Sequence, residues 1–231
     1  MAVEGIVFDL DATLVNLGGF VEWREAQRKA VEAYLECGLP EELISRCSDG
    51  GLFNMLNLVR DELSQTAPPS FIERIQGKAY DAVEKCEAEG VVKCHLMPGC
   101  LSSLEWLRDH GVKMGVATSN SQRVAERILE ANGIYAFFSA VVGRQPELRM
   151  KPHPDQILKC FEEMGVDPSR GVVVGDSVRD VRAAKSAGVY TIAVPSFFTK
   201  RQSLEEAGVD MIIEHLGELL RVVSELCIKP E

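Results

Sequence analysis

Four apolar segments of this chain each lead into polar side chains that could take part in phosphate chemistry. These side chains are Asp9 and Asp11, then Thr118 with Ser119 and Asn120, then Lys151, and finally Asp176 with Asp180. Carboxylates suit a hard, oxygen-liganded cation such as Mg²⁺, which binds few carboxylates together with waters and a substrate phosphate. A lysine ammonium and a threonine hydroxyl could neutralise the same phosphate from its other side. The sequence has no His or Cys cluster that indicates zinc.

Each group also has an ordinary structural explanation. The Asp9–Asp11 pair could form a solvated turn, Thr118 could cap a helix, and Lys151 could be a solvated loop residue. Asp176 or Ser177 could cap a helix while Asp180 faces water. The four groups nevertheless occur at four strand ends with complementary chemistry, and we therefore interpret them as one site.

Alternating strands and helices must position these groups. Residues 3–8 form a short β-branched run, and four later strands and a Met-Ile-Ile segment are expected at 112–118, 139–142, 172–174, 190–194 and 211–213. Helices are expected between and after them at 99–110, 121–132, 154–164, 178–187 and 216–227. This alternation predicts an α/β fold with a Rossmann-like parallel sheet covered by helices on both faces. Ligands of such sheets bind outside the carboxyl ends of the strands.

A helical segment interrupts this alternation. Apolar residues recur at helical spacing within 20–37, 40–48, 51–64 and 69–89. Gly18-Gly19 before these helices and Met97-Pro98-Gly99 after them are breaker signals placed where a pair of hinges would lie. We therefore predict an α/β core of residues 1–14 and 97–231, and a small all-helical cap domain of residues 15–96.

Composition excludes several classes of protein. Of the 231 residues, 46% are hydrophobic and 26% are charged, which excludes a disordered chain. No apolar stretch approaches the roughly 20 residues of a membrane-spanning helix, and no export signal is visible. The net charge of −10 provides no basic surface for nucleic acid. We expect a cytoplasmic protein, monomeric or homodimeric, whose seven cysteines are thiols that mostly pack in its interior.

The motifs resemble those of the haloacid dehalogenase superfamily, in order and over essentially the whole core. Asp9-Leu10-Asp11-Ala12-Thr13 is similar to its first motif, Thr118 to its second, Lys151-Pro152 to its third, and Gly175-Asp176-Ser177-Val178-Arg179-Asp180 to its fourth. The insert resembles the small helical cap of the phosphoglycolate phosphatase and β-phosphoglucomutase branch. One departure is Ala12, where many members have Gly; we expect the added methyl group to have a minor effect.

The resemblance implies a role for each residue. Asp9 would be the nucleophile that forms an aspartyl phosphate, and Asp11 would protonate the leaving oxygen and later activate water. Thr118, with Ser119 and Asn120, would hold phosphoryl oxygens, and Lys151 would neutralise both phosphate and Asp9. Mg²⁺ would bind the Asp9 carboxylate, the Asp11 backbone carbonyl and Asp176. Asp180 would be a water-mediated ligand or would orient Lys151.

The implied function is Mg²⁺-dependent hydrolysis of a small phosphorylated metabolite. A carbon–halogen reaction is disfavoured, because dehalogenases of the superfamily lack an acid at the position of Asp11. A phosphomutase that uses the same aspartyl phosphate is the alternative, and a non-catalytic phosphate-binding protein is less favoured because every chemical position is intact. Arg46, Asn54 and Arg60 of the cap could face the core, although solvated helix surface is their simpler interpretation. Core packing is the simpler role for most of the aromatic residues Trp23, Phe53, Phe137 and Phe138.

Overall fold

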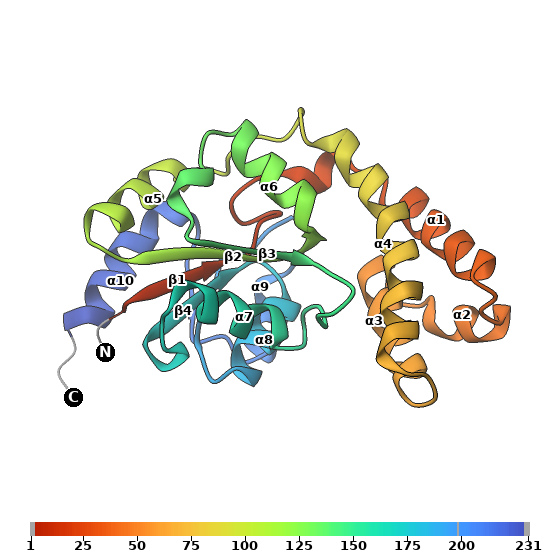
Figure 1. The fold of residues 1–231 in the computed structure, drawn as a ribbon. Helices are drawn as coiled ribbons and strands as arrows, with labels where there is room; N and C mark the ends of the chain where they lie inside the picture. Colours follow the sequence, from red (N-terminus) through yellow and green to blue (C-terminus); the bar gives the residue numbers. More distant parts are fainter. Residues whose placement is uncertain (1–2, 198, 229–231) are drawn as a thin grey trace.

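The computed structural model describes residues 3–197 and 199–228, apart from the side chains of residues 227 and 228. Within these residues, six parallel strands form one sheet in the order β3-β2-β1-β4-β5-β6. The sheet lies across the middle of Figure 1, where β1 to β4 are labelled. The strands are β1 (Gly5–Phe8), β2 (Lys113–Ser121), β3 (Ala140–Arg144), β4 (Gly171–Gly175), β5 (Tyr190–Ala193) and β6 (Met211–Ile212). The strand order reverses direction beside β1, which places a crevice at the carboxyl ends of β1, β2 and β4.

Alternate side chains of the strands pack against helices on opposite faces of the sheet. One layer contains α5 (Cys100–Asp109), α6 (Gln122–Ala131) and α10 (Leu219–Ile228), and the other contains α7 (Asp155–Met164) and α8 (Val178–Ser186). In β1, Ile6 and Phe8 belong to the core of the first layer, whereas Val7 belongs to that of the second. Both faces of the sheet are therefore buried, as the continuous apolar strands predict. The predicted fold class is confirmed.

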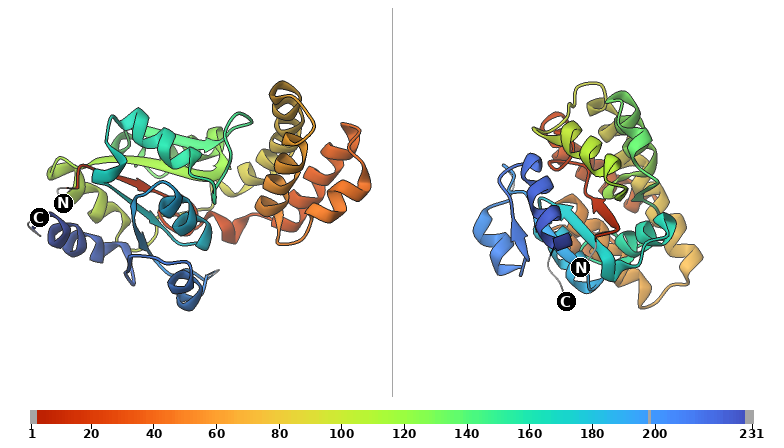
Figure 2. Two further views of the ribbon diagram at one scale, coloured as in Figure 1. Left: turned by 90° about the horizontal axis from the view of Figure 1, so that it is seen from below. Right: turned by 90° about the vertical axis from the view of Figure 1, so that its left-hand side faces the viewer.

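Four helices follow the first strand and lie to one side of the sheet, as the orange and yellow ribbons of Figures 1 and 2 show. They are α1 (Trp23–Glu36), α2 (Glu41–Cys47), α3 (Leu52–Ser64) and α4 (Pro69–Gly90). The buried residues Ala26, Ala30 and Tyr34 lie on one face of α1, and α1 packs mainly against α4. These helices form the predicted cap domain, while its boundaries at residues 15 and 96 stay a prediction.

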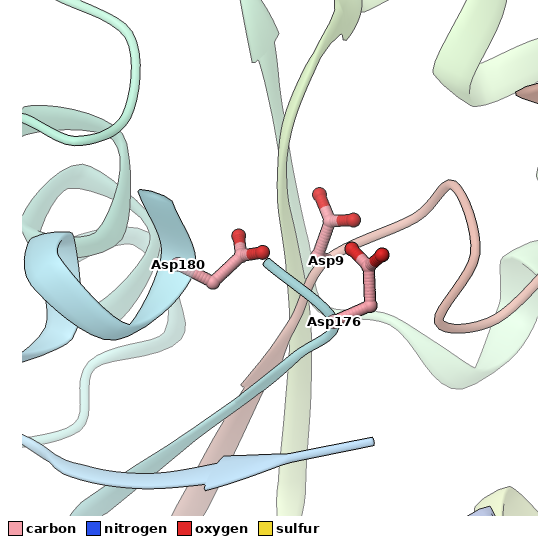
Figure 3. A group of neighbouring side chains, drawn as sticks. All are labelled: Asp9, Asp176 and Asp180. Carbon is pink, nitrogen blue, oxygen red and sulfur yellow. The ribbon is translucent and has the colours of Figure 1, made fainter. Parts of the chain in front are cut away.

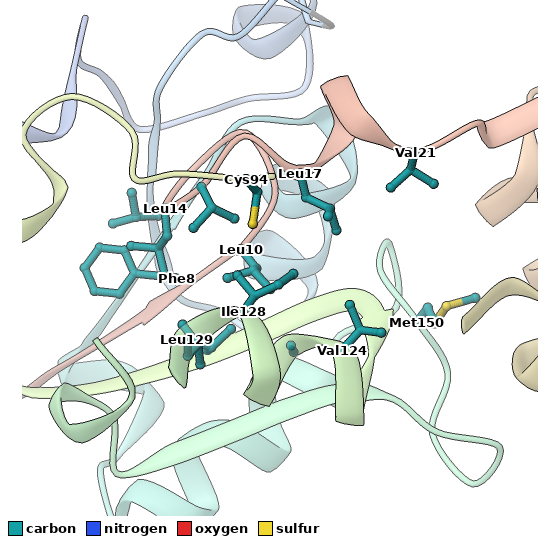
Figure 4. Packing of buried hydrophobic residues seen from close by; sticks show 14 of the residues in the cluster. Phe8, Leu10, Leu14, Leu17, Val21, Cys94, Val124, Ile128, Leu129 and Met150 are labelled. Carbon is teal, nitrogen blue, oxygen red and sulfur yellow. The ribbon is translucent and has the colours of Figure 1, made fainter. Parts of the chain in front are cut away.

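The two chain segments that join the cap helices to the sheet pair with each other. Val15 forms an antiparallel bridge with Leu96, and the Met97 amide donates to the Leu14 carbonyl at 2.8 Å. Leu10, Leu14 and Leu17 of the first segment are completely buried and belong to the core cluster drawn in Figure 4. The loop after β1 is thus held in place by its pairing with the returning segment and by its buried leucines.

Several local predictions differ from the structure. Strand β2 continues to Ser121, three residues beyond the predicted end, and its pairing with β3 is irregular between Ala117 and Ser121. Gly18 and Gly19 lie within a 3₁₀ turn, η1 (Leu17–Phe20). A short helix, α9 (Arg201–Glu206), and the turn η4 (Leu216–Glu218) before α10 were not predicted as separate elements.

Two predictions about composition can be compared with the described residues. Six cysteines are free thiols, five of them buried and Cys37 half-buried; the side chain of Cys227 lies outside the described residues. Within those residues, no helix has both the length and the hydropathy needed to cross a membrane.

Candidate active site

All the residues predicted to form the site line one cavity of about 790 Å³ at the carboxyl ends of the strands. Asp9 follows β1, Thr118, Ser119 and Asn120 form the last part of β2, and Asp176 follows β4. The cavity also reaches the cap, because Trp23 and residues 50–54 contribute to its lining. The structure therefore gathers the predicted residues between core and cap, and the role of each of them stays a prediction.

Lys151 is the centre of the polar contacts in this cavity. Its side chain is 4% exposed, and Nζ donates to Asp9 Oδ1 at 2.6 Å, to Asp180 Oδ1 at 2.5 Å and to the carbonyl of Ala117 at 2.8 Å. The side chain of Asn57, on α3 of the cap, donates to the Lys151 carbonyl at 3.1 Å. Lys151 is thus not a solvated loop residue, since its three donors are all satisfied by buried acceptors.

Asp180 accepts three hydrogen bonds, which come from two residues. Besides Lys151, it accepts from the Ser177 hydroxyl at 2.5 Å and from the Ser177 amide at 3.0 Å through Oδ2, which completes a capping box at the start of α8. A Cβ atom at Gly175 would lie 2.5 Å from the Asp180 side chain, so glycine allows this close approach. Ser177 therefore caps the helix as considered, but Asp180 is only 2% exposed and does not face water.

Burial governs the electrostatics of the four carboxylates. It raises the pKa of Asp9 to about 6, with Lys151 opposing the shift, and that of Asp11 to about 6. Burial and the neighbouring carboxylates of Asp180 and Asp9 raise the pKa of Asp176 to about 8. Burial also acts to raise the pKa of Asp180, but the ammonium of Lys151 outweighs burial and lowers that pKa. Carboxyl groups thus outnumber the one buried ammonium at the strand ends, so carboxylate is in excess around Lys151.

This surplus of carboxylate suits a divalent cation. One oxygen from each of Asp9, Asp176 and Asp180 lies within 4.8 Å of the other two, and Figure 3 shows the three side chains gathered at the strand ends. Both oxygens of Asp180 already accept hydrogen bonds from Lys151 and Ser177, which makes Asp9 and Asp176 the better direct ligands. The side chain of Asp11 is outside this group and accepts from the Gly18 amide at 2.7 Å. The oxygen-only donor set fits Mg²⁺.

The segment after β2 is organised by Glu87, a residue of the cap helix α4. Glu87 accepts from the Asn120 side chain at 3.1 Å and from the Ser121 amide at 3.2 Å. It also forms a fully buried ion pair with Arg144, whose guanidinium donates to the Ser119 carbonyl at 2.7 Å. The side chain of Asn120 is therefore engaged by Glu87, and Ser121, not Thr118, caps the following helix.

We expect Glu87→Gln to destabilise the fold strongly, because it leaves the Arg144 guanidinium buried without a counter-charge. Removing one partner of a buried ion pair costs about 3–5 kcal/mol. Unfolding in urea measures this loss, and Glu89→Gln, an exposed position of the same helix, is the matched control. Equal unfolding free energies for the two variants would show that the buried pair contributes no stability.

Ala12 requires a correction to the sequence-based expectation. Its φ is +61°, and it is the one non-glycine residue with positive φ among those the structure describes. A left-handed conformation costs an L-residue with a Cβ atom roughly 1–2 kcal/mol. The methyl group at this position is therefore not a minor change, because the turn between Asp11 and Thr13 takes the backbone conformation that glycine favours.

Two cap residues whose simpler interpretation was solvated helix surface contact the core or line the cavity. Arg60 donates to the carbonyls of Pro146 and Glu147 in the core, so it joins the cap to the loop that carries Lys151. Asn54 lines the cavity. Arg46 and Asn54 are both exposed on their helices, but only Arg46 keeps the simpler interpretation, since it pairs with Glu62 at 3.5 Å and does not line the cavity.

The aromatic residues divide between the cavity and the core. Trp23 and Phe53 line the cavity with their rings 5.4 Å apart, so core packing is not their only role. Phe138 packs edge to face against Phe8, with their ring centroids 6.4 Å apart.

Sequence reasoning did not identify Glu87, Arg144 or Gln156. The Gln156 side chain donates to the carbonyls of Thr118 and Gly143 at 2.7 and 2.9 Å, and it accepts from the Lys151 amide at 3.3 Å. A signal existed for Glu87, because it follows Val83 by four residues on the buried face of α4. A charged residue in phase with an apolar stripe indicates a buried ion pair. Neither Arg144 nor Gln156 has a comparable signal.

Comparisons with known proteins agree with this geometry. Residues 6–194 match the family described as haloacid dehalogenase-like hydrolase, and the chain belongs to that family. A glyceraldehyde 3-phosphate phosphatase of Methanopyrus kandleri is 30% identical over 97% of this chain and 98% of its own length. A phosphoglycolate phosphatase of Escherichia coli is 27% identical over 94% and 91%.

The fold is also shared with a solved structure. The crystal structure of CbbY from Rhodobacter sphaeroides, in complex with phosphate, superimposes with a TM-score of 0.64 at 22% identity. It covers 94% of this chain and 96% of its own. This likeness supports the fold: a sheet of this topology with an inserted helical cap.

Proposed function

We propose that the chain hydrolyses a small phosphomonoester through an aspartyl phosphate on Asp9, with Mg²⁺ as its cofactor. The observation that carries this proposal is the Lys151 ammonium, which lies 2.6 Å from Asp9 in a buried cavity that also contains Asp11 and Asp176. An anionic nucleophile can approach a phosphate only where such positive charge reduces their repulsion. The phosphatase names of the similar proteins support the same class of reaction.

Asp9, Asp11 and Lys151 have different roles in two successive displacements at phosphorus. A carboxylate oxygen of Asp9 forms a bond to phosphorus while the bond to the leaving oxygen breaks, and Asp11 gives that oxygen a proton. Asp11 then takes a proton from the water that attacks the phosphorus and releases Asp9. Lys151 stays beside Asp9 and offsets the charge of the phosphoryl oxygens in both steps.

Hydroxyl groups complete the phosphoryl site. The Ser119 hydroxyl is buried and has no hydrogen-bond partner among the described residues, so it is available to donate to a phosphoryl oxygen. The Thr118 hydroxyl is 3.1 Å from the Asn120 side-chain oxygen and can turn from that acceptor to the substrate. When bound by Asp9 and Asp176, Mg²⁺ supplies further positive charge against the repulsion between nucleophile and phosphate.

Removal of the metal is expected to stop hydrolysis. Phosphate release from a panel of phosphomonoesters should fall by about 100-fold or more in EDTA and return with Mg²⁺, because two anions must otherwise meet with Lys151 alone between them. Thermal unfolding gives a readout besides activity: Mg²⁺ should raise the midpoint of the wild type more than that of Asp176→Asn. Full activity after exhaustive dialysis against EDTA would contradict a metal-dependent mechanism.

The same panel separates hydrolysis from the alternative phosphomutase reaction. A hydrolase releases phosphate from its substrate, whereas a mutase interconverts sugar phosphate isomers without net release. Both reactions use the same aspartyl phosphate, so the chemistry of Asp9 does not distinguish them. We propose the hydrolase because the similar curated proteins named above are phosphatases.

A further inference from the structure

The proposed chemistry leaves one cation of the cavity without a role. Arg179, in the first turn of α8, lines the cavity and is half-buried. Its guanidinium makes no hydrogen bond or ion pair with any residue that the structure describes. Arg144 in the same region, by contrast, is paired with Glu87. The charge of Arg179 helps to lower the pKa of the adjacent Asp180, but no carboxylate among the described residues accepts its hydrogen bonds, so its donors are available to bind an anion.

The cap holds Arg179 in position. The guanidinium carbon lies 4.8 Å from the centre of the Phe53 ring on α3, and this ring lies 5.4 Å from that of Trp23. A guanidinium over an aromatic face keeps its in-plane N–H donors free, so the contact orients the group without occupying it. Arg179 therefore presents its donors to a ligand where core and cap meet.

Charge decides what kind of ligand group this site suits. The phosphoryl group is already served by Lys151 and by the proposed cation at Asp9 and Asp176. Arg179 and Lys200 are two further cations in the lining, and Thr199 and Ser203 add hydroxyl groups. A neutral leaving group would leave the Arg179 donors unused, whereas a carboxylate or second phosphoryl group would accept two of its N–H bonds.

We propose that Arg179 is a specificity-determining residue that binds a second anionic group on the leaving group of the substrate. This inference rests on the proposed phosphatase function and narrows its substrate class to small phosphomonoesters with a carboxylate or another phosphoryl group. The Phe53 contact makes the recognition dependent on the cap, since the ring that orients Arg179 belongs to α3.

Three esters of one carbon skeleton test this specificity. Phosphoglycolate carries a carboxylate, ethanediol bisphosphate carries a second phosphoryl group, and 2-hydroxyethyl phosphate is the neutral reference. In Arg179→Gln, kcat/KM for an anionic ester relative to the neutral one should fall by about 10- to 100-fold, mainly through KM, because charge-assisted hydrogen bonds are lost. Arg179→Lys should recover part of the ratio. Arg182→Gln, at an exposed position of the same helix, is the matched control.

Each outcome has a distinct meaning. A fall confined to phosphoglycolate identifies a carboxylate as the anion, and a fall confined to the bisphosphate identifies a phosphoryl group. Equal losses on all three esters would overturn the inference, because Arg179 would then only join cap to core, and so would a wild-type preference for the neutral ester. No release from these three esters, with release from other members of the wider panel, would overturn this inference alone, whereas no release from any phosphomonoester would overturn the proposed function and this inference with it.

Discussion

Asp9→Asn is expected to lower the turnover of every phosphomonoester by about 10⁴-fold or more, the scale seen when a catalytic nucleophile is removed. An amide oxygen cannot form the phosphoryl bond, although it keeps nearly the same volume. The fold should persist, because Lys151 retains Asp180 and the Ala117 carbonyl as acceptors. Steady-state phosphate release measures the loss, and circular dichroism checks the fold.

The control for this variant is Asp81→Asn. Asp81 is an exposed residue of the cap helix α4 and does not line the cavity. It should retain wild-type turnover. If Asp9→Asn were folded and kept more than a few per cent of the wild-type rate, Asp9 would not be the nucleophile.

Asp11→Asn should have an effect that depends on the leaving group. For an alkyl phosphate, kcat should fall by roughly 10²- to 10⁴-fold, because the departing alkoxide needs the proton of Asp11. Burial raises the pKa of Asp11 to about 6, so it holds a proton closer to neutral pH than an exposed carboxyl group does. For p-nitrophenyl phosphate the loss should be smaller, since that phenol leaves with little help from an acid.

The comparison between the two esters is the measurement, because each serves as the control for the other. Equal losses would exclude an acid role for Asp11 and would leave it a structural part of the turn that ends at the Gly18 amide.

The sheet and the four polar groups of the site could be predicted because their signals are local. An apolar run that ends abruptly in a carboxylate, as at Phe8 and Asp9, marks both a buried strand and its carboxyl end. Parallel strands bring all such ends to one edge, so Asp9, Thr118 and Asp176 could be placed together without a structure.

The residues that hold this site in shape could not be found in the same way. Glu87 contacts Asn120 and Arg144, which are 33 and 57 positions away in the chain, and no spacing within one segment predicts such contacts. The positive φ of Ala12 belongs to a turn whose neighbours Leu10 and Leu14 are buried in the core. From the sequence alone, Arg179 is most simply explained as a solvated residue on the surface of a helix. Its contact with the Phe53 ring of the cap can be seen only in the structure.

Trapping of the phosphorylated enzyme tests the central claim most directly. The wild-type protein with Mg²⁺ and a phosphomonoester is quenched in acid during turnover, digested, and searched by mass spectrometry for a phosphoryl adduct. We predict one hydroxylamine-sensitive adduct, on the peptide that contains Asp9, which is absent from Asp9→Asn. Turnover without any adduct, or with an adduct on another residue, would contradict the mechanism.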